Sequence, residues 1–151
     1  MSAVPGKARM QDHLVIELQG NLSELPGLAR QVEAFGARNK VPAATINQIN
    51  LALDELLTNT ISYGFDGPGS RRIKVTLRLD DGTIAMELLD DGRPFDPFAR
   101  PDPDVTQPIE SRPIGGLGVF FVRKLMDHVD YQHVNGQNRV TLIKKTNLPS
   151  S

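Results

Sequence analysis

The chain of 151 residues contains no cysteine. This absence excludes disulfide bonds, thiolate zinc sites and cysteine nucleophiles, and it fits a reducing compartment. No stretch approaches the ~20 consecutive apolar residues that a helix needs to cross a bilayer. The N-terminal segment also lacks the apolar core of a signal peptide. We therefore expect a cytoplasmic protein that has no membrane partner.

The chain also has almost no net charge. Its formal value at pH 7 is −1, so no excess of positive charge favours nucleic acid as a direct partner. Hydrophobic residues make up 39% of the chain and charged residues 23%, which are the proportions of an ordinary globular protein. Together with the length, they predict one domain that buries a core of its own.

Three segments carry the periodicity of helices. The first covers residues 21–40, with Ser23 as a plausible N-cap. A Val-Pro pair then breaks the chain, and the next helix runs from Pro42 to near Gly64. The third begins in the glycines of residues 115–118.

The remaining patterned segments alternate as strands do. A short strand is expected over residues 13–20, and residues 71–92 form a hairpin that turns at Asp-Gly. A second hairpin closes the chain over residues 130–145 and turns at Asn-Gly. The order β-α-α-β-β-loop-α-β-β predicts an α+β fold, specifically a two-layer α/β sandwich. Its mixed, mostly antiparallel sheet would carry the helices on one face.

One long loop interrupts this pattern. Residues 94–113 contain six of the eleven prolines and almost no apolar run. Long loops inside compact domains are usually functional or disordered. We expect a flexible N-terminus over residues 1–12 and a single domain over residues 13–146, with the loop spanning about residues 94–114.

The second helix is unusually poor in charge. Between residues 43 and 63 the only charged side chains are Asp54 and Glu55. Its apolar residues fall on one broad face that must pack on the sheet: Ile46, Ile49, Leu53, Leu56, Leu57 and Ile61. Glu55 and Asn59 are stacked one turn apart on the other side. The pair is either an exposed feature of the surface or a site for a polar ligand.

Two further motifs are individually weak. Asp90 ends a strand and Gly92 follows it, so a carboxylate that can accept from an amino group stands beside a glycine that permits close backbone approach. An ordinary Asp-Asp-Gly turn without any ligand would have the same sequence. The glycines at 115, 116 and 118 lead into a helix, whose N-terminus attracts anions. Neither the P-loop nor the G-x-G-x-x-G fingerprint is present.

The order of the three motifs is more specific than any one of them. E-x-x-x-N on a helix, D-x-G after a strand, a proline-rich loop and G-G-x-G before a helix resemble the Bergerat fold of gyrase, heat-shock chaperones, histidine kinases and mismatch-repair ATPases. Within this histidine kinase-like ATPase superfamily, "DELLTNTISYGF", "DDGRPFDP" and "GGLGVFFVRKLMDHVDY" are most similar to the bacterial anti-sigma-factor serine kinases. The similarity covers about residues 14–145.

The resemblance implies roles for the helical and strand motifs. Asn59 would coordinate Mg²⁺ between the phosphates of ATP, and Glu55 would act as general base on the serine hydroxyl of a protein substrate. Asp90 would read adenine, with Gly92 as the close-approach glycine. Both Glu55 and Asn59 would then face the γ-phosphate, where positioning and charge neutralisation drive phosphoryl transfer.

The resemblance also implies that the loop of residues 94–114 is an ATP lid. The phosphates would be bound by the segment Gly115, Gly116, Leu117, Gly118 and Val119. Arg112 is placed where it could reach a phosphate, and Thr141 where it could touch the adenine edge. At Tyr63 the sequence departs from many members, which carry histidine there.

The function that follows is an ATP- and Mg²⁺-dependent protein-serine kinase. It would phosphorylate an anti-sigma-factor antagonist and sequester a sigma factor, and the resemblance also allows a homodimer. One alternative is a regulator that binds nucleotide and captures partners without phosphotransfer. The other is a detached histidine-kinase catalytic domain, which is disfavoured because the lid is short and the chain has no room for a histidine-bearing pair of dimerisation helices.

Overall fold

The computed structural model describes residues 10–65, 71–99 and 116–146. Three α-helices and five strands follow one another in the predicted order. They are β1 (Met10–Leu18), α1 (Leu25–Arg38), α2 (Ala43–Tyr63), β2 (Ile73–Asp80), β3 (Thr83–Asp90), α3 (Gly116–Leu125), β4 (His128–Val134) and β5 (Gln137–Lys145), with a 3₁₀ turn at Leu22–Glu24.

The five strands form one sheet in the order β1-β2-β3-β5-β4. All four neighbouring pairs are antiparallel, so the sheet is more uniformly antiparallel than the mixed sheet that we expected. Strand β5 lies between β3 and β4 because the chain crosses from β3 to the edge of the sheet through α3 and then returns. This crossing brings the end of β3 beside the beginning of β5.

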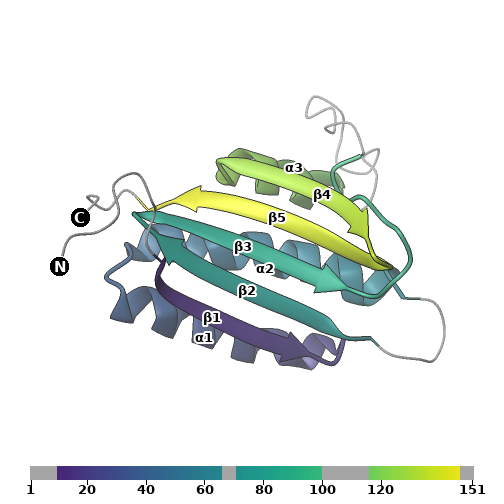
Figure 1. Ribbon diagram of the computed structural model, residues 1–151, viewed down its shortest axis with the longest axis horizontal. Coiled ribbons are helices and arrows are strands. Elements are labelled where there is room, and N and C mark those ends of the chain that lie inside the picture. The colour runs from purple at the N-terminus through teal and green to yellow at the C-terminus, as the bar shows by residue number, and fades with distance from the viewer. Residues whose placement is uncertain (1–9, 66–70, 100–115, 147–151) are drawn as a thin grey trace.

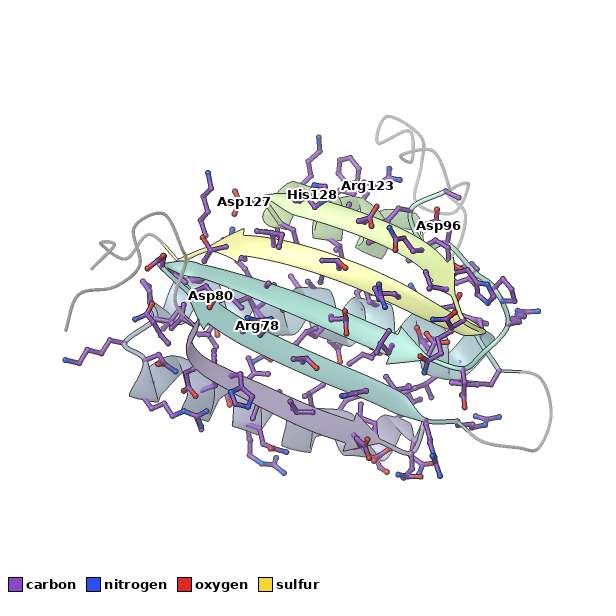
Figure 2. All side chains as sticks on the ribbon, in the orientation of Figure 1. Arg78, Asp80, Asp96, Arg123, Asp127 and His128 are labelled. Carbon is purple, nitrogen blue, oxygen red and sulfur yellow. The ribbon has the colours of Figure 1, made fainter. Side chains whose placement is uncertain are left out.

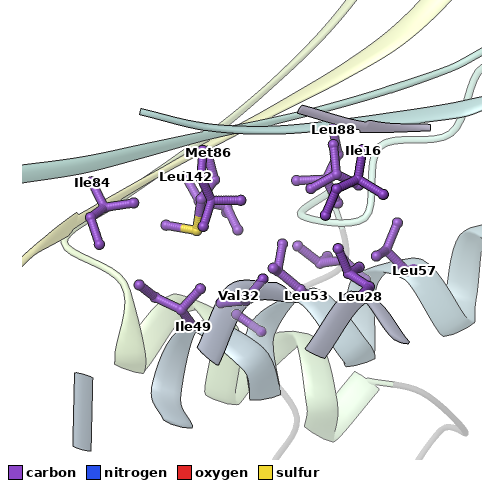
Figure 3. Close-up of a cluster of buried hydrophobic side chains, with 14 of the residues drawn as sticks. Ile16, Leu28, Val32, Ile49, Leu53, Leu57, Ile84, Met86, Leu88 and Leu142 are labelled. Carbon is purple, nitrogen blue, oxygen red and sulfur yellow. The ribbon is translucent and has the colours of Figure 1, made fainter. Parts of the chain in front are cut away.

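All three helices lie on the same face of the sheet (Figure 1). Their apolar sides meet the sheet in a single core, part of which is shown in Figure 3. The core contains every residue of the predicted apolar face of α2: Ile46, Ile49, Leu53, Leu56, Leu57 and Ile61. The predicted α+β two-layer architecture is therefore confirmed.

Both predicted hairpin turns are present. Asp81 and Gly82 have φ values of 45° and 76°, and Asn135 and Gly136 have values of 54° and 76°. Two successive positive φ angles are typical of the type I′ turn, which matches the twist of the flanking strands. The turns fix the registers within β2–β3 and β4–β5.

In the part of the chain that the structure describes, no helix covers the opposite face of the sheet (Figure 1), and polar side chains lie on it (Figure 2). Arg78 and Asp80 lie there on β2 (Figure 2), with their charged atoms 3.8 Å apart. Among the described residues, no helix has both the length and the apolar character that crossing a bilayer requires.

The structure differs from the expected boundaries at the N-terminal end. Strand β1 begins at Met10 rather than at residue 13. Asp12, within it, accepts hydrogen bonds of 2.7 Å from both Arg38 and Asn39 at the end of α1. The two donors hold the pKa of the Asp12 carboxyl well below its usual range. These contacts tie the start of β1 to α1.

Ser23 does not cap the first helix, contrary to our expectation. It lies inside the 3₁₀ turn that precedes α1. The free amides at this end are satisfied instead by the Glu24 carboxylate, which accepts from Asn21 N at 3.0 Å and from Gln19 N at 2.9 Å. A carboxylate three residues after Asn21 reaches back to these amides, as in a capping box.

Candidate functional site

Glu55 and Asn59 lie on the side of α2 that faces away from the core. Both side chains are partly buried, and Asn59 Nδ2 donates to Glu55 Oε1 at 3.4 Å. Asp54, the neighbouring acid, is exposed. The helical spacing that predicted a stacked pair therefore places an acid and an amide next to each other.

The start of α3 covers part of the same side of α2. Gly118 lies so close to Glu55 that a Cβ at position 118 would overlap the carboxylate. Ala52 is fully buried, and an apolar groove between the two helices is lined by Leu51, Ala52, Glu55, Gly118, Phe121, Val122 and Leu125. Helix α2 thus carries little charge because one side packs on the sheet and part of the other side packs on α3.

The end of β3 places a second carboxylate near the C-terminus of α2. Asp90 is only 8% exposed, and Gly92 N donates to its Oδ1 at 2.9 Å. Gly92 itself passes so close to the carbonyl of Gly64 that a Cβ would collide with it. Arg93 N then donates to the same carbonyl at 3.0 Å. The glycine therefore allows the strand end to dock on the end of α2.

Burial raises the pKa of Asp90 above its usual range, and the hydrogen bonds from Asn138 and Gly92 oppose that rise. The cause is the loss of solvation that an ionised carboxylate suffers in a low-dielectric environment. A buried, perturbed carboxylate in a concave site is a candidate for ligand binding.

One pocket connects the end of β3 with α2. It is lined by polar residues (Asn59, Thr60, Asp90, Arg93, Asn138), by apolar residues (Leu56, Leu57, Ile73, Leu88, Phe95, Pro97, Val140) and by Gly64. Apolar walls with a few convergent polar groups are typical of small-molecule sites. The two motifs that were separate in the sequence, Asn59 and Asp90, thus line the same pocket.

Asn138 and Tyr131 were not among the predicted site residues. Asn138 Nδ2 donates to Asp90 Oδ1 at 2.9 Å, and the Tyr131 hydroxyl donates to Asn138 Oδ1. Asn138 shares its side of β5 with Val140 and Leu142, which are buried. A polar residue in a core-facing position of an alternating strand is the signal that could have identified it.

The side chains of two predicted residues do not line the pocket. Thr141 pairs with Glu87 on β3 and with Asp130 on β4, so its side chain points to the face of the sheet opposite the helices. Alternation along β5 brings Asn138, not Thr141, to the side of Asp90. The side chain of Val119 is buried in the α3 packing, which leaves only its backbone for a ligand.

The remaining predicted residues are only partly described. Gly116 and Leu117 form the first turn of α3. Gly115, Arg112 and most of the loop over residues 94–114 lie outside the described residues. Tyr63 is exposed, and its backbone carbonyl accepts from Arg93 Nη2 at 2.6 Å.

The residues of the pocket fit a magnesium ion only in part. Among the described residues, no three His, Asp or Glu side chains are arranged to hold a metal. The Asn59 amide donates to Glu55, which leaves its oxygen free of any hydrogen bond within the described part of the chain. Mg²⁺ usually binds through one or two protein oxygens together with substrate phosphates, and Asn59 fits that arrangement.

Several named proteins are similar to this chain in sequence. Serine/threonine-protein kinase BtrW of Bordetella bronchiseptica is 27% identical over 111 residues, which cover 74% of this chain and 78% of that protein. Serine-protein kinase RsbW of Listeria monocytogenes is 27% identical over 134 residues, 85% of each chain. An anti-sigma F factor of Clostridium botulinum is 29% identical over 79% of this chain and 84% of its own.

Solved structures share the fold. The RsbU and RsbW domains of a Mycobacterium tuberculosis protein align with a TM-score of 0.67 at 19% identity and cover 93% of this chain. This chain spans 34% of that one. A blue-light activated histidine kinase from Erythrobacter litoralis aligns with a TM-score of 0.55 at 18% identity, covering 83% of this chain and 60% of its own.

The profile of the family described as "Histidine kinase-like ATPase domain" matches residues 18–144. The match begins at the last residue of β1 and ends one residue before the end of β5. It therefore includes α2, the end of β3, α3 and all the residues that line the pocket between α2 and β3. The chain belongs to the histidine kinase-like ATPase domain family.

Proposed function

We propose that this chain is an ATP-dependent protein-serine kinase that also acts as an anti-sigma factor. The observation that carries the proposal is the meeting of Asn59 and Asp90 in one pocket, with Glu55 one helical turn from Asn59. In this proposal Asp90 binds the base, Asn59 binds the metal, and Glu55, one helical turn before Asn59 on α2, is the general base.

ATP would enter the pocket with its base toward Asp90. The carboxylate accepts a hydrogen bond from the amino group of adenine, and the ring lies among apolar residues such as Leu88, Phe95 and Val140. The triphosphate then extends along α2 past Asn59. The glycines at the start of α3 offer backbone amides and the positive end of a helix dipole to the phosphates.

Glu55 would take the proton from the serine hydroxyl of the protein substrate. The serine oxygen then forms a bond to the γ-phosphorus, the bond from that phosphorus to the bridging oxygen breaks, and ADP leaves. Asn59 would hold Mg²⁺, which neutralises charge on the phosphates when it is bound. The hydrogen bond from Asn59 keeps the Glu55 carboxylate beside this position.

The partners are proposed from the relatives. Two proteins that are named serine or serine/threonine kinases and one that is named an anti-sigma factor each match at least 74% of this chain. We therefore infer an antagonist protein that carries the acceptor serine, and a sigma factor that is released when the antagonist competes for the kinase. Such partners would place the protein in the cytoplasm.

The experiment that tests the proposal is a transfer assay with Glu55→Gln. Labelled ATP, Mg²⁺ and a candidate antagonist are incubated with the wild type and the variant. Loss of a general base is expected to slow transfer by about 100- to 10,000-fold, while ATP binding remains. Asp54→Asn is the matched control, because Asp54 is the adjacent acid and is exposed. Transfer by Glu55→Gln at the wild-type rate would overturn the role of Glu55.

The second candidate is a regulatory module that binds nucleotide and captures partners without transfer. It predicts that ATP binds the wild type while no phosphate reaches any antagonist. The pairing of Glu55 with Asn59 beside the pocket favours the kinase, because binding alone does not require a base. A protein that bound no ATP while folded would overturn both candidates.

A further inference from the structure

Asn138 is the polar side chain around which the base end of the pocket is organised. It is 4% exposed and stands opposite Asp90 in the register of β3 and β5. Its Nδ2 donates to Asp90 Oδ1 at 2.9 Å and to the carbonyl of Arg93 at 2.8 Å. Its Oδ1 accepts from the Tyr131 hydroxyl and from Phe95 N, the latter at 3.3 Å. Both ends of the amide are therefore used inside the protein.

Tyr131 fixes the direction of this amide. The Tyr131 hydroxyl donates to Asn138 Oδ1 and accepts from Phe95 N at 3.1 Å. If the Asn138 amide were turned over, its NH₂ group would face the N–H of Phe95 and its oxygen would face the Asp90 carboxylate. Two donors would then meet on one side and two acceptors on the other. The hydrogen-bond network thus permits only one orientation.

The orientation of Asn138 determines which oxygen of Asp90 remains for a ligand. Oδ1 already accepts from Gly92 N and from Asn138 Nδ2. Among the described residues, no donor reaches Oδ2. A ligand that enters the pocket therefore meets an acceptor with a fixed direction. An amino group on its base would pair with that acceptor, whereas a carbonyl group at the same place would be repelled.

The same side chain holds the beginning of the loop that follows β3. The carbonyl of Arg93 and the amide of Phe95 both bond to Asn138, and Phe95 lines the pocket. Because Asn138 bonds both to this loop segment and to the Asp90 carboxylate, a shift of one is expected to shift the other. Asn138 therefore links the position of Asp90 with the position of residues 92–95.

We propose that Asn138, oriented by Tyr131, is a positioning residue that confers selectivity for a nucleobase with an exocyclic amino group and anchors residues 92–95 against the pocket. The inference rests on the proposed function, because it assumes that this pocket takes the base of the nucleotide. It adds Asn138 and Tyr131 to that function. These residues contact Asp90 or the loop at Phe95 and do not contact the reacting atoms.

The test compares the binding of ATP with that of inosine triphosphate, which carries an oxygen in place of the amino group. Affinities are measured with the folded full chain for the wild type, Asn138→Ala, Asn138→Asp and Tyr131→Phe. Gln137→Ala is the control, because Gln137 is the exposed neighbour on the same strand. The wild type and the control should prefer ATP by about 10- to 100-fold, the range of one hydrogen bond to a charged group.

The Asn138 variants should lose most of this preference because ATP binds more weakly while inosine triphosphate binds as before. A purely structural role would instead weaken both nucleotides equally. Tyr131→Phe keeps the ring and removes only the hydroxyl, so it should fold and reduce the preference. It should also speed amide hydrogen exchange in residues 92–97 without any nucleotide, since the Phe95 N–H loses a partner.

Each contrary outcome has a separate meaning. Full selectivity in Asn138→Ala, or in Tyr131→Phe if the alanine variant does not fold, overturns the inference and leaves the kinase proposal intact. If the wild type binds ATP and inosine triphosphate with equal affinity, Asp90 does not recognise the amino group of the base. Failure of the folded wild type to bind ATP overturns the proposed function itself.

Discussion

Gly118 at the start of α3 lies directly against the carboxylate of Glu55 on α2, with no room for a Cβ between them. The two residues are 63 positions apart, and this contact brings the glycine-rich helix start to the acid that we propose as the general base. A phosphate held by the first amides of α3 would consequently lie beside Glu55.

We therefore expect Gly118→Ala to displace the Glu55 carboxylate and to reduce phosphotransfer by about 100-fold, the cost of a shift of roughly 1 Å in a reacting group. Gly27→Ala is the control, since an added Cβ there meets only the distant end of Arg30. Phosphotransfer rates and thermal unfolding should be measured for both variants. A fully active Gly118→Ala protein would show that this contact has no part in catalysis.

Asn59 is expected to carry the effect of Mg²⁺ on nucleotide affinity. Because it is the only protein ligand that we propose for the metal, Asn59→Ala should reduce the Mg²⁺-dependent part of ATP affinity at least about tenfold. ATP titrations with Mg²⁺ and with a chelator measure that part directly. Ser62→Ala, on the exposed side of the same helix, should behave as the wild type. An undiminished Mg²⁺ effect in Asn59→Ala would contradict the assignment.

Asp90→Asn should separate stability from binding. Burial raises the pKa of Asp90, so its ionised form destabilises the folded state at pH values above the raised pKa. The amide variant removes that charge, and its oxygen can still accept from Gly92 and Asn138. Its NH₂ group, however, would face the pocket as a donor. We expect a higher unfolding temperature at pH 7 and an ATP affinity at least about tenfold lower.

The gain in stability of Asp90→Asn should depend on pH. As the pH falls through the raised pKa toward the ordinary value of 3.8, wild-type Asp90 becomes protonated and no longer carries a buried charge. The unfolding temperatures of the two proteins should then converge. Thermal unfolding from pH 7 to pH 3.5 measures this, and a constant difference across the range would show that burial of the charge is not its source.

Asp12 should contribute to stability in the opposite direction. Its folded pKa is lowered by Arg38 and Asn39, so ionised Asp12 stabilises the fold at pH values above the unfolded pKa of about 3.8. The contribution is lost as the pH falls from there toward the lower folded value. Asp12→Asn should thus lower the unfolding temperature at pH 7 and have little effect in strong acid. An Arg38→Gln variant should show the same loss.

Much of the fold follows from local patterns. The alternation in β2 and β3 and the Asp-Gly turn between them predicted a hairpin, and the structure contains it with the expected core side. The spacing of Glu55 and Asn59 predicted that their side chains would lie next to each other on one helix face. These features depend on the periods of 2.0 and 3.6 residues and on the sterics of a few turn residues.

The boundaries depended on contacts that local patterns do not contain. Residues 10–12 belong to β1 because Met10 and Asp12 pair with Asp80 and Leu79 of β2, more than 60 residues later in the chain. The side chain of Asp12 also accepts hydrogen bonds from Arg38 and Asn39. The first helix is preceded by a turn that Glu24 closes, so Ser23, which has the preferred side chain for a cap, does not serve as one. Propensity alone could not decide between two polar residues in the same turn.

The sequence by itself determined the order of the elements, the apolar faces and the three motifs, because each depends on residues a few positions apart. Only the tertiary structure decided that β5 pairs with β3, so that Asn138 meets Asp90 across 48 residues while Thr141 faces the opposite side. It also decided that α3 packs on α2 and brings Gly118 to Glu55. Such pairings follow from the burial of a shared core, to which every element contributes and which no short segment encodes.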